Sequence, residues 1–92
     1  MGYSIEVQSE ALIEMREAFK WYELQKAGLG YELLTIVESC YQKLSDNPQY
    51  YSMINQRYRR IRTNPFPYFL IYEIEESRVI IISFFHVKRG GS

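Results

Sequence analysis

The chain has 92 residues, of which 47% are hydrophobic and 16% aromatic, and its 11 basic and 11 acidic side chains cancel to a formal net charge of zero. This length supplies one core, and the hydrophobic content excludes an intrinsically disordered chain. The sequence predicts neither a bilayer-spanning segment nor a secretory signal, and the lone Cys40 excludes an internal disulfide. We therefore expect a single cytoplasmic domain over residues 1–92.

The first half of the sequence predicts a strand and a pair of helices. Residues 3–7, "YSIEV", alternate with a period of two, which indicates a short strand. Ser9 fits the N-cap of a helix with apolar residues at helical spacing, and Gly28 in "KAGLG" ends that helix. A second amphipathic helix should run from Leu29 and stop before Pro48, because the residue before a proline disfavours helical backbone angles.

After Pro48 the hydrophobic period changes to that of strands. Residues 57–62 are expected to form one strand, with Tyr58, Arg60 and Arg62 on one face and Arg57, Arg59 and Ile61 on the other. A hairpin of residues 66–76 and 79–87 follows, and its second strand is apolar on both faces, which is typical of a central strand.

The predicted class is α+β with the order β-α-α-β-β-β, in which a helical hairpin packs on one face of a small antiparallel sheet. Ten residues are expected to supply much of the core: Leu12, Met15, Phe19, Leu33, Val37, Leu44, Ile71, Ile80, Ile82 and Phe84.

The neutral total hides a charge asymmetry. Residues 1–46 carry 8 acidic and 4 basic side chains, whereas residues 47–92 carry 3 acidic and 7 basic ones. Four of the basic residues are arginines within positions 57–62. Such a cluster predicts contact with an anionic partner, because guanidinium groups match phosphates and carboxylates in bidentate geometry. The alternative is that Glu73 and Glu75 on the next strand pair with these arginines across the sheet.

The sequence contains few groups suited to catalysis. One histidine and one cysteine do not make a zinc site, and no glycine-rich phosphate loop follows a strand, so we expect no metal and no cofactor. His86, at the end of the last strand, is the one side chain whose unperturbed pKa suits proton transfer near neutrality. Alternatively, His86 is an ordinary histidine at the end of a strand, without a catalytic role. Tyr68 and Tyr72 supply stacking surfaces of the kind used against nucleic-acid bases.

Three stretches in this order, "AFKWYELQKAGLGYELL", "NPFPYFLIYEI" and "VIIISFFHVKR", resemble the RelE/ParE superfamily of bacterial toxins, also described as plasmid-stabilization proteins, over residues 3–89. The "WYE…GLG" turn and "FPY" are more similar to the ParE-type branch than to the ribonuclease branch. The resemblance implies one toxin domain over residues 1–92, the toxin component of a type II toxin–antitoxin system, which a cognate antitoxin holds inactive.

The two branches imply different sites. A ParE-like protein inhibits DNA gyrase and is not an enzyme. The target-binding residues would then be Arg57, Arg59, Arg60, Arg62, Tyr68, Lys88 and Arg89. A RelE-like protein is an endoribonuclease that cuts mRNA on the ribosome. Here Glu73, or alternatively Glu75, would be the base, His86 the acid, and Arg62 with Arg60 the phosphate clamp.

Members of the ribonuclease branch often have more lysines on the strand before "FPY" and a tyrosine near the C-terminus. This chain resembles them in neither feature, which favours gyrase as the target. A non-toxic binding or regulatory domain on the same fold stays open, as do a homodimer and a toxin–antitoxin hetero-oligomer. No membrane partner is expected.

Overall fold

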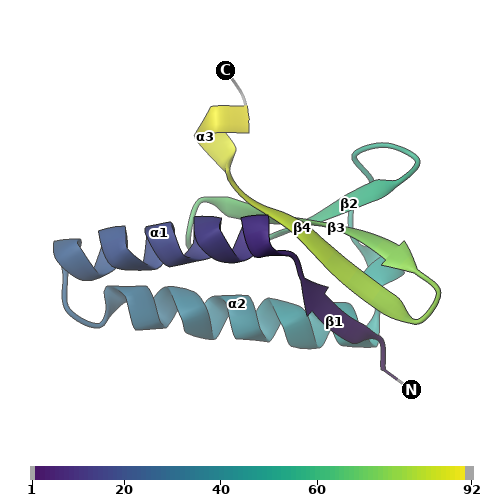
Figure 1. Ribbon diagram of the computed structural model, residues 1–92, viewed down its shortest axis with the longest axis horizontal. Coiled ribbons are helices and arrows are strands. Elements are labelled where there is room, and N and C mark those ends of the chain that lie inside the picture. Colours follow the sequence, from purple (N-terminus) through teal and green to yellow (C-terminus); the bar gives the residue numbers. More distant parts are fainter. Residues whose placement is uncertain (1, 91–92) are drawn as a thin grey trace.

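The computed structural model describes residues 2–90, apart from the side chain of Arg89 (Figure 1). The elements follow in the order β1 (Ser4–Val7), α1 (Ser9–Gln25), α2 (Leu29–Asp46), the 3₁₀ helix η1 (Pro48–Tyr50), β2 (Tyr58–Arg62), β3 (Tyr68–Glu75), β4 (Arg78–His86) and α3 (Val87–Gly90). The predicted α+β class and β-α-α-β-β-β order are confirmed, with the two short helices η1 and α3 in addition. Within residues 2–90, none of the helices combines the length and the apolar character needed to cross a membrane.

The strands form one sheet in the order β1-β4-β3-β2. The pairs β2–β3 and β3–β4 are antiparallel, and β4 lies inside the sheet as its apolar sequence predicted. The prediction of a wholly antiparallel sheet is wrong, because β1 pairs with β4 in parallel, from Ser4 opposite Arg78 to Val7 opposite Ile81. Alternating apolar residues specify a strand but neither its neighbour nor its direction.

The helices α1 and α2 form an antiparallel hairpin that covers one face of the sheet (Figure 1). We call this the inner face and the opposite one the outer face. Gly28 has a φ of 94°, as predicted, although it lies at the N-cap of α2. The Glu23 carboxylate accepts the N–H groups of Gly28 at 3.1 Å and Gly30 at 2.7 Å. A negative charge therefore satisfies the unpaired donors at the start of α2.

The core lies between the hairpin and the inner face. Six of the ten predicted core residues are buried: Met15, Leu33, Val37, Leu44, Ile80 and Phe84. Phe19, Ile71 and Ile82 are half-buried instead, and Leu12 is 44% exposed. Leu12 is exposed because α1 turns Ala11, Met15 and Ala18 toward the sheet, which places Leu12 to one side of the buried stripe.

A β-bulge explains why Ile82 was misassigned, whereas Ile71 faces outward because its neighbours in β3, Leu70 and Tyr72, turn toward the core. Ile71 pairs with Ser83 but Tyr72 pairs with Ile81, so Ile82 is an extra residue in β4. Before the bulge the odd-numbered residues of β4 face the helices, and after it Phe84 does. A strict period of two cannot place both ends of such a strand correctly.

Gly30 marks the closest approach of the two helices. A Cβ atom added there would lie 2.7 Å from the carbonyl oxygen of Phe19 and 2.8 Å from its Cδ1. A glycine-to-alanine change in an open helix stabilises by about 1 kcal/mol. We expect Gly30→Ala to do the opposite and lower the free energy of unfolding by about 1–3 kcal/mol, through overpacking.

Urea unfolding followed by circular dichroism measures this change. Thr35→Ala in the same helix, at an exposed position, is the matched control and should leave stability within about 0.5 kcal/mol. A Gly30→Ala protein as stable as the parent would mean that the helices do not pack as closely as described.

Tyr72 makes stability depend on pH. Its hydroxyl donates to the carbonyl oxygen of Pro48 at 2.6 Å in a buried position, and burial raises its pKa to about 12. Between pH ~10 and ~12 the unfolded chain loses this proton while the folded protein keeps it, so the free energy of unfolding should fall as pH rises. Below pH ~10 the stabilisation by this group is fully present and should not change with pH. Tyr72→Phe should be less stable at neutral pH but show a shallower fall; equal slopes for the two proteins would refute this assignment.

Candidate target-binding site

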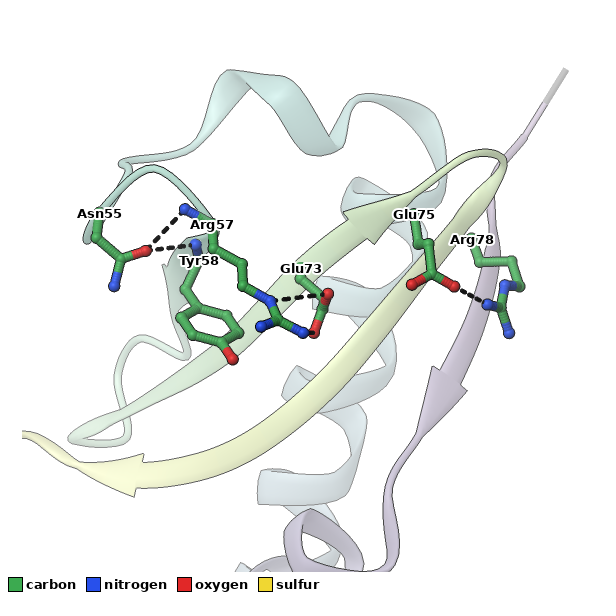
Figure 2. Close-up of polar contacts among 6 residues, drawn as sticks. All are labelled: Asn55, Arg57, Tyr58, Glu73, Glu75 and Arg78. Carbon is green, nitrogen blue, oxygen red and sulfur yellow. Dashed lines mark hydrogen bonds and ion pairs between the residues drawn. The ribbon is translucent and has the colours of Figure 1, made fainter.

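Arg57, the first residue of the arginine cluster, is held in an ion pair (Figure 2). The side chain of Asn55 accepts the N–H groups of Arg57 and Tyr58, each at 2.8 Å, which fixes the turn before β2. The guanidinium of Arg57 lies 3.3 Å from the Glu73 carboxylate, and this hydrogen bond raises the pKa of Arg57. The predicted face for Arg57 is wrong, because Arg57 precedes β2 and its side chain turns to Glu73 on the outer face.

Glu75, the other carboxylate expected to offset the cluster, pairs with Arg78 at the turn between β3 and β4 (Figure 2). Arg78 also contacts Glu6 on β1 at 2.6 Å. The pairing alternative is therefore confirmed for Arg57 with Glu73 but not for Glu75 with the cluster.

Arg59 points to the inner face and is tied to the backbone. Its Nη1 donates to the carbonyl oxygens of Gln49 at 2.9 Å and Tyr51 at 2.8 Å. The residue is half-buried and lies opposite Tyr72 in the sheet. Arg59 therefore fastens the segment around η1 to β2, and its Nη1 donors are used within the fold.

Arg60 and Arg62 differ from both neighbours. They are exposed on the outer face, and their guanidinium carbons lie 4.4 Å and 5.6 Å from the ring centroid of Phe69. Within residues 2–90, neither has a carboxylate at ion-pair distance. We call Arg60, Arg62 and Phe69 the arginine patch. It borders an open hollow of about 520 Å³, which Tyr50 and Ser52 also line.

The remaining predicted target-binding residues lie elsewhere. Tyr68 stacks on Phe84 with ring centroids 4.2 Å apart and faces α1. Lys88 is exposed in α3, and its backbone N–H donates to Nδ1 of His86 at 3.1 Å. The Arg89 side chain lies outside the described residues. The predicted set is thus divided between the two faces of the sheet.

The three residues of the ribonuclease hypothesis are not brought together. Glu73 is five residues along β3 from Tyr68, which pairs with His86, and this corresponds to a separation of about 17 Å. Glu73 faces outward with Arg57, whereas His86 lines a cleft against α1. Arg62 is on the outer face, so it shares neither a face with His86 nor a contact with Glu73.

Other reactive groups are sparse within residues 2–90. Cys40 is buried and burial raises its pKa, so its thiol is a poor nucleophile. Across residues 2–90, no group of three or more histidine, cysteine, aspartate or glutamate side chains is arranged to hold a metal ion.

The sequence reasoning missed Phe69 as a functional residue. The aromatic run around it reads as core, and only the pairing of β2 with β3 places Phe69 opposite Arg62 on the outer face. A signal was present in the sequence: Phe69 shares the odd-numbered side of its strand with the charged Glu73 and Glu75, which marks that side as outward-facing.

Two comparisons with known proteins agree with this fold. A family model described as "ParE toxin of type II toxin-antitoxin system, parDE" matches residues 5–90. A solved structure titled "Chromosomal ParDE TA system from P. aeruginosa" is similar with a TM-score of 0.80 and 9% sequence identity, covering 92% of this chain and 96% of that one. No curated protein matches the sequence.

A helical hairpin against a small sheet, matched over nearly the whole chain, defines a toxin of the RelE/ParE superfamily. Within it, the chain belongs to the ParE toxin family of type II toxin–antitoxin systems. It is therefore the toxin of such a pair, and its partner is an antitoxin.

The arrangement of the arginines generates a stability prediction. Arg59→Ala removes a charged donor shared by two backbone carbonyls and should lower the free energy of unfolding by about 1.5–3 kcal/mol. Arg60→Ala loses an exposed contact with Phe69 and should cost at most about 1 kcal/mol. Chemical denaturation of the two variants measures the difference. If the order were reversed, Arg59 would not be the residue that fastens η1.

Proposed function

We propose that this toxin inhibits DNA gyrase without catalysing a reaction, and that the arginine patch binds an anionic surface of the gyrase–DNA complex. The proposal takes residues 1–92 as one toxin domain that acts in the cytoplasm. The observation that carries it is the pair of exposed arginines, Arg60 and Arg62, which no carboxylate neutralises within residues 2–90. Two unneutralised guanidinium groups on one strand face repel each other, so an anionic partner gains from both.

The patch is suited to binding because it is preorganised. Arg60 and Arg62 are alternate residues of β2, about 6.6 Å apart along the strand, which is close to the spacing of successive phosphates on one DNA strand. Both guanidinium groups lie over the ring of Phe69, so each makes a cation–π contact with it. Arg57 and Arg59 have little part in this proposal. The charge of Arg57 is offset by Glu73, and Nη1 of Arg59 is bonded to two backbone carbonyls.

A binding mechanism also fits the scattered titratable groups. RNA cleavage needs a base and an acid on the two sides of one phosphate, within hydrogen-bond reach. Glu73 and His86 lie far apart along the β3–β4 hairpin and face opposite sides of the sheet. This is unfavourable for that arrangement. The ribonuclease alternative therefore receives no support from this geometry.

The test is a gyrase supercoiling assay with purified toxin. Arg60→Ala with Arg62→Ala should raise the toxin concentration for half-inhibition by at least ~10-fold, since each charge-assisted contact contributes about 1.5–3 kcal/mol. The matched control is Arg57→Ala with Arg78→Ala, which removes the same charge from ion-paired arginines on the same face. This control should stay within about threefold of the parent.

A second assay tests the ribonuclease alternative. Translating ribosomes with labelled message should yield no cuts, and His86→Ala should leave inhibition of supercoiling nearly unchanged. Message cleavage with unaffected supercoiling would overturn the proposal, as would equal losses in the two double variants.

A further inference from the structure

A second site lies on the inner side of the sheet, away from the arginine patch. A cleft of about 590 Å³ opens between α1 and the neighbouring ends of β3 and β4. Among the residues that line it are Glu14, Glu17 and Trp21 from α1, and Tyr68, Phe84 and His86 from the sheet. No lysine or arginine lines it within the described residues. The target-binding site does not use this cleft.

The aromatic wall of the cleft is rigid. Tyr68 stacks on Phe84 with ring planes 10° apart, and Tyr22 packs edge-on against Tyr68. Trp21 packs edge-on against Tyr22, with ring centroids 5.0 Å apart, yet remains 56% exposed. A half-uncovered tryptophan beside fixed rings is typical of a pocket that a partner side chain fills.

The carboxylates give the cleft its charge. Glu14 and Glu17 are three residues apart on α1, so they lie on the same side of the helix. Oε1 of Glu14 accepts the backbone N–H of Phe84 at 3.0 Å and the hydroxyl of Ser83 at 3.2 Å. These bonds hold the carboxylate in place beyond the end of β1, where the edge of β4 is no longer paired. Within residues 2–90, neither glutamate has a basic partner at ion-pair distance.

The exposed ring of Trp21, beside two carboxylates without a basic partner in residues 2–90, selects a planar cation. A guanidinium group can stack on an aromatic ring while its edge donates to carboxylate oxygens, whereas an ammonium group lacks the planar face. The same negative charge repels phosphates, which excludes a nucleic-acid backbone as the occupant.

We propose that this cleft binds an arginine side chain of the antitoxin. Arginine is the protein side chain that carries a guanidinium group, and the protein partner that family membership supplies is the antitoxin. The inference rests on the toxin–antitoxin assignment and is independent of gyrase as the target. The cleft and the arginine patch are on opposite faces, so an antitoxin contact here adds affinity without occupying the patch.

The chain offers a direct reporter, because Trp21 is its only tryptophan and lines the cleft. Purified toxin is titrated with the small protein encoded beside it, and with 15-residue synthetic peptides that cover that protein's sequence. Each arginine of a binding peptide is then replaced by citrulline, its neutral isostere. For one arginine, the replacement should weaken binding at least ~10-fold, as the loss of a charge-assisted contact predicts. Binding of the arginine peptide should change the fluorescence of Trp21, and the citrulline peptide should not produce this change.

The toxin variants complete a double-mutant cycle. In the double variant Glu14→Gln with Glu17→Gln, the affinity for the arginine peptide should fall to that of its citrulline form. The affinity for the citrulline peptide should stay unchanged. Glu17→Gln alone covers the case in which the loss of Glu14 disturbs folding, because Glu17 is exposed. Glu32→Gln with Glu38→Gln, on the exposed side of α2, is the matched control and should bind normally.

Three outcomes would overturn the proposal. The first is that no citrulline replacement weakens binding by more than about twofold. The second is that the glutamine variants bind as tightly as the parent. The third is a concentration-dependent self-association of the toxin that the glutamine variants abolish, because the occupant would then be an arginine of a second copy. Supercoiling is measured on the same variants and should be unchanged, so failure of the gyrase proposal is separate from failure of this one.

Discussion

The pairing of β3 with both neighbours is the constraint on which the sites depend. Its register with β2 places Arg62 opposite Phe69 on the outer face and Arg59 opposite Tyr72 on the inner face. Its register with β4, which includes the bulge at Ile82, turns His86 toward α1. A shift by one residue would exchange the faces of the whole strand, so the two sites exist only in this register.

Within this register, charge is segregated by face. The outer face holds the arginine patch, and its other arginines are neutralised by Glu6, Glu73 and Glu75. On the inner side, helix α1 carries Glu14 and Glu17 beside the aromatic rings at the ends of β3 and β4. A chain with no net charge therefore presents one surface for an anion and another for a cation. A toxin needs both properties if its target and its antitoxin are to be recognised by different chemistry.

The sequence predicted the elements well because most of them follow from hydrophobic period and breakers. The helical hairpin, its positive-φ glycine and the central position of β4 are of this kind. The direction of β1 and the bulge were not predictable, since both depend on pairing between distant segments. The four arginines are close together in the sequence, but their division into residues held within the fold and exposed residues depends on contacts with Gln49, Tyr51 and Glu73.

The same distant contacts fix the position of the strand that carries the patch. Arg59 and Tyr72 are cross-strand neighbours on the inner face, and both bond to carbonyls of the segment around η1, at Gln49, Tyr51 and Pro48. That segment also contributes Ser52, whose carbonyl oxygen accepts the N–H of Arg60 at 3.0 Å. The backbone of the patch is therefore held from both edges of β2, by β3 on one side and by this segment on the other. Arginines on such a strand lose little backbone entropy when a partner binds, so more of each contact is realised as affinity.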